Sequence, residues 1–317
     1  MRDARRLIRD AGLATMNGMD PELEPFLPLF PPSDLSDIPQ ARRQLAELAA
    51  AVPADIAAHL DIEDRTVPGE PAVPVRIYRP QHARGAIVWA HGGGFVMGDL
   101  DTEHPWATRL ADGSGATVIS VGYRLAPEHP FPAAHDDMYA VLTWAAAHAD
   151  ELGIDPARIA VGGHSSGAGI AASVALRARD EQGPPICLQL LNQPGLDDRQ
   201  RSWSARNFTD TPFLNRSKVT QMWEYYLQGT PATPYAAPAR ATDLAGLPPA
   251  YIATAEYCPN RDEDIDYALR LLWAGVPVEL HQWPGTFHGS QAIVSAAVSQ
   301  RQNEEFAAAL RRAVGEP

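Results

Sequence analysis

A pentapeptide that could supply a nucleophile lies at residues 163–167, which read Gly-His-Ser-Ser-Gly. It lies between an apolar segment at 159–162 and an alanine-rich segment at 168–179, where a predicted strand meets a predicted helix. A serine on such a sharp turn projects its hydroxyl from the sheet edge, and small flanking residues let strand and helix approach closely. The helix N-terminus behind it favours a developing oxyanion. The pattern therefore predicts Ser165 as a catalytic nucleophile.

Three consecutive glycines follow another predicted strand, at 86–90, within the run His-Gly-Gly-Gly-Phe at 91–95. Three glycines cost conformational entropy and would be poor choices for a simple loop. Their use is exposed backbone N–H groups, which can point at a tetrahedral oxyanion together with the N–H of Ser166. A phosphate-binding loop is the alternative, but no Lys-Ser/Thr follows and the P-loop pattern fails.

A histidine that could serve this serine lies in a loop predicted at 283–289, after the last apolar segment. The chain has ten histidines, and a lone histidine is more often structural than catalytic. Order along the chain favours His288, because enzymes with this serine turn place the histidine near the C-terminus, after the acid. His164 adjoins the nucleophile, points elsewhere on the turn, and is expected either to support the reacting residues from behind or to have a structural role.

Cofactor and metal patterns fail on their context. Gly-Ala-Gly-Ile-Ala-Ala at 167–172 matches the dinucleotide fingerprint, but its glycines lie inside the predicted helix. The acids Asp180 and Glu181 precede the next strand instead of ending it. The two cysteines, Cys187 and Cys258, lack the C-x-x-C spacing of a zinc or redox site. We therefore expect neither a cofactor nor a metal.

The charge balance argues against nucleic acid as a partner. The chain has 26 basic and 39 acidic side chains, a formal net charge of −13. Its longest basic concentration is the set Arg2, Arg5, Arg6 and Arg9, interpreted as a solvated helix face, whereas polyanion binding needs clustered basic residues. The charge also disfavours strongly anionic substrates through the long-range field, although a local pocket can override it.

The N-terminal 20 residues show no signal-peptide pattern, and no window approaches the roughly 18 apolar residues that a membrane span needs. Two cysteines are too few for a disulfide framework, which favours a reducing compartment. We expect a soluble, cytoplasmic protein.

The elements that must position these residues alternate between strand and helix. Apolar or alternating strand patterns are separated mostly by helical periods, and they occur at 73–78, 86–90, 117–121, 159–162, 186–191, 250–255 and 278–283. This alternation predicts an α/β fold whose mostly parallel sheet is covered on both faces by helices. Ligands bind at the carboxyl ends of such strands, where the serine, glycine and histidine segments fall.

With these residues in hand, the chain resembles the hormone-sensitive-lipase-like branch of the α/β-hydrolase carboxylesterases. The resemblance runs from about Val73 to the C-terminus and rests on motifs in register at 91–95, 123–134, 163–167 and 275–289. It implies an α/β-hydrolase fold with a helical cap over the pocket. The cap would comprise an N-terminal arm, 1–60, and an insertion at about 199–242 in the catalytic domain, 61–317. Five aromatic residues of the insertion could line an acyl site or form the cap core: Phe208, Phe213, Trp223, Tyr225 and Tyr226.

The resemblance implies Ser165 as nucleophile, His288 as general base, and the N–H groups of Gly93, Gly94 and Ser166 as oxyanion donors. It also exposes a departure. The branch reads Asp-Pro-Leu-Arg-Asp-Glu after its seventh strand, and the first Asp orients the histidine. Here the run is Cys-Pro-Asn-Arg-Asp-Glu at 258–263, so Cys258 stands at the acid's position.

Nearby carboxylates could replace the missing acid. Glu256 ranks first, because alternate residues of a strand share a face and its side chain is long. The other candidates are Asp262, which is also a candidate helix cap, Glu263, Asp197 and Asp198.

Two functional hypotheses follow. The first is a cofactor-independent serine carboxylesterase that cleaves short- to medium-chain esters through an acyl-enzyme, with lactones or amides as variants. The second is a non-catalytic small-molecule binder that keeps the hydrolase fold, as the resembling plant gibberellin receptors do. Cys258 motivates the second hypothesis, whereas intact Ser165, His288 and the glycine run oppose it. Branch members often pair through the last strand and helix, so a homodimer is a further hypothesis.

Overall fold

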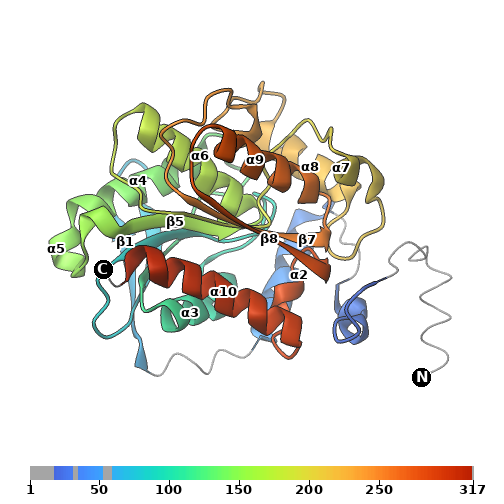
Figure 1. The fold of residues 1–317 in the computed structure, drawn as a ribbon, viewed down its shortest axis with the longest axis horizontal. Helices are drawn as coiled ribbons and strands as arrows, with labels where there is room; N and C mark the ends of the chain where they lie inside the picture. The colour runs from blue at the N-terminus through green and yellow to red at the C-terminus, as the bar shows by residue number, and fades with distance from the viewer. Residues whose placement is uncertain (1–17, 31–34, 53–58, 316–317) are drawn as a thin grey trace.

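The computed structural model describes residues 18–30, 35–52 and 59–315 (Figure 1). These residues form one eight-stranded sheet in the order β1-β2-β4-β3-β5-β6-β7-β8. β2 pairs antiparallel with β1 and β4, and the other neighbouring pairs are parallel. The strands are β1 (Asp61–Val67), β2 (Val73–Arg79), β3 (Ala86–Ala90), β4 (Thr117–Val121), β5 (Ile159–His164), β6 (Gln189–Asn192), β7 (Ala250–Tyr257) and β8 (Val278–Phe287). The predicted mostly parallel sheet is confirmed.

Helices cover both faces of the sheet, as Figure 1 shows. One face carries α3 (Leu100–Ser114) and α10 (Ala297–Val314), and the other carries α4 (Ala133–Ala147), α6 (Ser166–Asp180) and α9 (Arg261–Trp273). Successive side chains of a strand point to opposite faces, so β3 contributes to two cores. Ile87 and Trp89 join the core with α3 and α10, whereas Val88 and Ala90 join the other. This double burial explains the continuous apolar run of β3.

Two strands, β1 and β8, differ most from the sequence prediction, and β6 begins at Gln189 instead of at the predicted residue 186. β1 directly follows the helical pattern that the sequence predicts up to about Leu60. Its run Asp-Ile-Glu-Asp-Arg-Thr-Val is too polar to have predicted a strand. β1 lies at the sheet edge, where most of its side chains remain accessible and pair with arginines of β2, as Asp64 does with Arg76. β8 is longer than predicted and includes most of the loop predicted at 283–289, so His288 directly follows a strand.

The described parts of the predicted cap lie close to the carboxyl ends of the strands. The arm contributes η1 (Glu24–Leu29) and α2 (Ile38–Ala50), and the insertion contributes α7 (Trp203–Asn207) and α8 (Arg216–Leu227). α8 packs onto the glycine loop through Tyr226, whose ring stacks on Phe95 at 3.9 Å between centroids. The remainder of the predicted arm, including the arginine set at 2–9, lies outside the described residues.

Within the described residues, no helix is both long and apolar enough to cross a membrane.

Candidate active site

Ser165 occupies the sharp turn between β5 and α6. Its backbone has φ +53° and ψ −118°, a conformation that residues other than glycine rarely adopt. Gly163 and Gly167 flank it, and a Cβ at either position would collide with the backbone around Ala90 of β3. The glycines of the pentapeptide are therefore required for the close approach of β3, β5 and α6.

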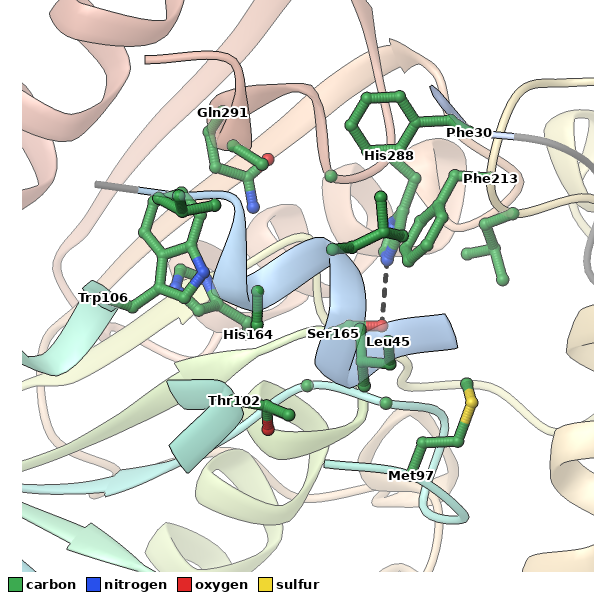
Figure 2. A pocket seen from close by; sticks show the side chains of 18 of the residues that line it. Phe30, Leu45, Met97, Thr102, Trp106, His164, Ser165, Phe213, His288 and Gln291 are labelled. Atoms are coloured by element: carbon green, nitrogen blue, oxygen red, sulfur yellow. Dashed lines mark hydrogen bonds between the residues drawn. The ribbon is translucent and has the colours of Figure 1, made fainter. Parts of the chain in front are cut away.

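His288 follows β8 and faces this serine. Its Nε2 lies 2.9 Å from the Ser165 hydroxyl oxygen, the contact dashed in Figure 2. Its ring is buried and stands nearly parallel to the ring of Phe213, with centroids 6.3 Å apart. The predicted nucleophile and base are thus brought within hydrogen-bonding distance, the geometry that proton transfer from serine requires.

The second ring nitrogen of His288 meets a sulfur. Cys258 follows β7, is fully buried, and places its Sγ 3.1 Å from Nδ1 of His288. The structure therefore places a thiol where the branch pattern has the carboxylate of an aspartate.

Glu256 points elsewhere, which corrects its first rank among the candidate acids. Its carboxylate accepts a hydrogen bond of 2.7 Å from the N–H of Gly285, and its backbone carbonyl accepts one from Arg261. The same-face argument fails because the pairing of β7 with β8 is irregular between Ala255 and Tyr257.

The remaining candidate acids have other partners. Asp262 accepts hydrogen bonds from the Ser204 N–H and from Arg261. Asp197 pairs with Arg199 at 2.6 Å, and Asp198 pairs with Arg240 at 2.6 Å. Glu263 accepts hydrogen bonds from the backbone N–H groups of Leu196 and Asp197. In the described part of the chain, none of these carboxylates bonds His288.

Burial keeps both members of the thiol–imidazole pair neutral. Burial is the main reason that the pKa of His288 is lowered to about 3, and the positive charge of Lys218 lowers it further. Burial also raises the pKa of the Cys258 thiol, and the carboxyl group of Asp264 adds to this rise. Transfer of a proton from the serine to His288 therefore creates an imidazolium with no negative charge beside its Nδ1, where only the neutral Cys258 thiol lies.

The glycine loop lies next to the serine with two strained positions. Gly93 has φ +126° and Gly94 has φ +62°, values that L side chains rarely adopt. A Cβ on Gly94 would also overlap the side chain of Met222 on α8. Among the described residues, no oxygen accepts a hydrogen bond from the backbone N–H groups of Gly93, Gly94 or Ser166. These three donors remain available to an oxyanion.

His91 holds the base of this loop. Its buried ring stacks on Tyr123 at 4.0 Å between centroids, and its Nδ1 lies 2.7 Å from the carbonyl oxygen of Gly92. The Tyr123 hydroxyl donates to the carbonyl oxygen of His91. Burial lowers the pKa of His91 to about 4, so the ring is neutral near pH 7 and acts here as a packing and hydrogen-bonding group.

A cavity of about 310 Å³ opens over Ser165 and His288. This volume is at the lower end of the range for ligand pockets, which suits a short or medium acyl chain. Figure 2 shows Phe30, Phe213 and His288 on one side of the serine and Trp106, His164 and Gln291 on the other. Residues of α2, including Leu45 and Leu48, close the cavity.

Of the five cap aromatics, Phe213 lines the cavity. Trp223 and Tyr226 are buried against Phe95, which fits the alternative expectation that they form the core of the predicted cap. The Tyr225 hydroxyl bonds the carbonyl of Leu35, and Phe208 packs near Tyr257, so both have contacts away from the cavity.

Several wall residues carry no sequence motif that could have identified them. Trp106 and Glu103 come from α3, and Lys218 comes from α8. His164, expected to have a supporting or structural role, lines the cavity and also lies 2.9 Å from the side-chain nitrogen of Asn192. Long-range packing brings Trp106, Glu103 and Lys218 to the serine, whereas His164 is its neighbour in the chain. The described residues contain no group of three or more His, Cys, Asp or Glu that could hold a metal ion.

Comparison with known proteins agrees with this geometry. A family model for the α/β-hydrolase fold matches residues 87–292. The carboxylesterase NlhH of Mycobacterium tuberculosis is 41% identical over 314 residues, covering 93% of this chain and 96% of the relative. Esterase LipI of the same organism is 45% identical over 242 residues, covering 73% of this chain and 75% of the relative.

Solved structures point the same way. A bacterial heroin esterase superimposes with a TM-score of 0.90 at 43% identity, covering 95% of this chain and all of that structure (100%). Esterase LipW from Mycobacterium marinum gives a TM-score of 0.85 at 40% identity, covering 94% and 97%. The chain belongs to the α/β-hydrolase fold family, in the hormone-sensitive-lipase-like branch that the sequence motifs indicate.

Proposed function

We propose that this chain is a serine carboxylesterase that hydrolyses short- to medium-chain carboxylic esters through an acyl-enzyme. The observation that carries the proposal is the 2.9 Å contact between Ser165 Oγ and His288 Nε2, beside a glycine loop with unused N–H donors. Relatives that cover most of the chain at 41–45% identity carry the names carboxylesterase and esterase.

In the acylation step, Ser165 Oγ attacks the ester carbonyl carbon while His288 Nε2 takes the hydroxyl proton. The carbonyl oxygen becomes an oxyanion, which the N–H groups of Gly93, Gly94 and Ser166 stabilise. Collapse of the tetrahedral intermediate expels the alcohol, which receives the proton from His288. Water then repeats the sequence on the acyl-enzyme and releases the carboxylic acid.

Cys258 is the positioning residue for the base. For Nε2 to accept the serine proton, Nδ1 must carry a hydrogen, and this N–H then donates to Sγ of Cys258 at 3.1 Å. A sulfur fixes this tautomer less firmly than a carboxylate and brings no negative charge to the imidazolium. The expected enzyme is therefore slow for its family, since loss of the triad acid costs about 10⁴ in turnover where it has been measured.

The test is steady-state hydrolysis of p-nitrophenyl esters with acyl chains of two to twelve carbons. We expect the best kcat/KM among short and medium chains and a loss of roughly 10³-fold or more in Ser165→Ala. Ester hydrolysis that survives Ser165→Ala would refute the proposed nucleophile. A wild type that binds esters without cleaving them would favour the binder hypothesis, which no observation on the structure supports.

Both cysteines are free thiols, which supports a reducing, cytoplasmic location. The net charge of −13 supports the expectation that nucleic acid is not a partner. A homodimer is supported by exposed apolar side chains next to the open edge of β8, on α9 and on β8 itself: Leu269, Leu272, Trp273 and Leu280.

A further inference from the structure

Lys218 is an unusual residue for this chain and for its position. It is the single lysine of the sequence, since the other Lys/Arg side chains are all arginines. It lies in the first turn of α8, is only 3% exposed, and lines the cavity that contains Ser165 and His288. Lysine is almost never fully buried unless it is paired.

The ammonium group has few partners. Its Nζ donates one hydrogen bond of 2.9 Å to the carbonyl oxygen of Phe213 and lies 4.5 Å from the centroid of the Phe213 ring. In the described part of the chain, no carboxylate forms an ion pair with Nζ, and two of its three N–H donors have no acceptor. A buried cation without a counter-ion favours an anionic ligand.

The rest of the cavity does not supply that counter-ion. Glu103, the single carboxyl group among the described lining residues, is held by the Trp89 indole N–H at 2.7 Å. Burial raises the pKa of Glu103 to about 8, so this carboxyl is mostly protonated near pH 7. Burial lowers the pKa of Lys218 only to about 8, so its amine is mostly charged at the same pH.

We propose that Lys218 makes the enzyme selective for esters that carry a free carboxylate, on the acyl or on the alcohol side, by pairing with that carboxylate in the cavity. The inference rests on the proposed esterase function. No described arginine lines the cavity, so one ammonium matches one negative charge better than it matches a phosphate dianion.

The pairing has a consequence for the chemistry. Lys218 opposes protonation of His288, because both would be positively charged in the same low-dielectric cavity. A substrate carboxylate on Lys218 cancels this repulsion and places a negative charge near the imidazolium, which Cys258 does not provide. Carboxylate-bearing esters should therefore gain in kcat as well as in KM.

The kinetic test compares matched esters in the wild type, Lys218→Met and Arg216→Met. One pair is 4-nitrophenyl hydrogen glutarate against 4-nitrophenyl valerate, and the other is 4-carboxyphenyl butyrate against phenyl butyrate, after subtraction of spontaneous hydrolysis.

We expect Lys218→Met to lower the ratio of kcat/KM for the charged ester to kcat/KM for the neutral ester by about 10- to 100-fold for at least one pair. This is the contribution of a charge-assisted hydrogen bond. Arg216→Met removes a positive charge from the exposed side of the same helical turn and should leave both ratios unchanged. Ratios that Lys218→Met leaves unchanged overturn the proposal.

A second measurement does not depend on turnover or on the Lys218 variant. Since the chain has one lysine, the only amines that trinitrobenzenesulfonate can label are Lys218 and the N-terminus, and peptide mass spectrometry distinguishes these two sites from each other and from labelled cysteines. In Ser165→Ala, monoethyl glutarate should slow labelling of Lys218 at least about fivefold more than ethyl valerate does, with N-terminal labelling as the internal control. Equal protection by both esters overturns the inference. If monoethyl glutarate protects Lys218 from labelling but the wild type hydrolyses no ester, the esterase proposal is refuted and Lys218 belongs to a carboxylate-binding site.

Discussion

The sulfur of Cys258 lies 3.1 Å from Nδ1 of His288, at the position where a carboxylate oxygen would complete a Ser-His-acid triad. The proposed nucleophile Ser165 and the proposed base His288 lie 2.9 Å apart, beside the glycine loop. A neutral thiol accepts the N–H of Nδ1 weakly, and it can also donate its own proton there, which leaves Nε2 protonated and unable to accept from Ser165. We therefore expect the proposed base, His288, to be held beside Ser165 without the stabilisation that a triad carboxylate would give to its imidazolium.

Restoring the carboxylate should activate the enzyme. In Cys258→Asp, the Cγ atom replaces Sγ and a carboxylate oxygen can reach Nδ1 with a small shift. We expect kcat for p-nitrophenyl butyrate to rise by about 10- to 10³-fold, a part of the roughly 10⁴ that a triad acid is worth. The same change at the half-buried Cys187, to Asp, is the control and should leave kcat unchanged. A wild-type kcat already equal to that of Cys258→Asp would mean that another group performs the role of the acid.

Glu256 should be dispensable for turnover. Glu256→Gln keeps an oxygen acceptor for the Gly285 N–H and should change kcat by less than about threefold. Glu256→Ala removes that acceptor and should destabilise the fold by about 0.5–1.5 kcal/mol, measured by denaturant unfolding. A collapse of kcat in Glu256→Gln with unchanged stability would restore Glu256 as the acid.

The pH profile should reveal the unsupported base. Protonated His288 cannot accept from Ser165, so activity falls where the ring titrates. Burial lowers that pKa to about 3 from an ordinary value near 6.5. The acid limb of the kcat/KM profile should therefore also shift to lower pH, so that the enzyme stays active at pH 5. In Cys258→Asp the carboxylate stabilises the imidazolium, so the limb should move back up. Tryptophan fluorescence across the range checks that the protein stays folded, and a wild-type limb near pH 6.5 would contradict the prediction.

The serine turn and the glycine loop could be predicted from sequence because local geometry determines them. Backbone collisions at Gly163 and Gly167 leave few alternatives to glycine, so the pentapeptide carries its own structural reason. The sheet follows from apolar runs that are buried on both faces, as in β3. The edge strand β1 carries little of this signal, since one face and one edge remain in solvent.

The surroundings of His288 could not be predicted in the same way. Ranking Glu256 assumed regular alternation along β7, and the irregular pairing beside Tyr257 breaks that alternation. Lys218 reaches the cavity because α8 packs over the glycine loop, a contact between segments more than 120 residues apart in the chain. No local sequence pattern encodes such a contact, so the side chains proposed to determine substrate selectivity could not be identified from the sequence.

The oxyanion loop should tolerate no side chain at Gly94. Gly94→Ala strains a backbone at φ +62° and drives its Cβ into Met222, so we expect kcat to fall by about 10²- to 10³-fold with a smaller change in KM. Gly115→Ala is the matched control, because Gly115 has φ +71° but open space around it, and it should affect stability rather than kcat. The double variant Gly94→Ala/Met222→Ala removes the collision and should recover part of kcat. Full activity in Gly94→Ala would show that this loop position does not bind the oxyanion.

The apolar face beside the open edge of β8 should mediate self-association. Leu269, Leu272 and Trp273 are exposed along one side of α9, and Trp273 at 77% is the most exposed large apolar side chain of the described residues. Burying a tryptophan at the centre of an interface contributes about 2 kcal/mol or more, so Trp273→Glu should weaken dimerisation by roughly 30-fold or more. Light scattering during size-exclusion chromatography should give a mass of two chains for the wild type and one for Trp273→Glu at the same concentration. Trp203→Glu, which alters an exposed tryptophan of α7, should remain dimeric. A wild-type mass of one chain at all concentrations would exclude this dimer, and in that case the exposed leucines of α9 would need another partner.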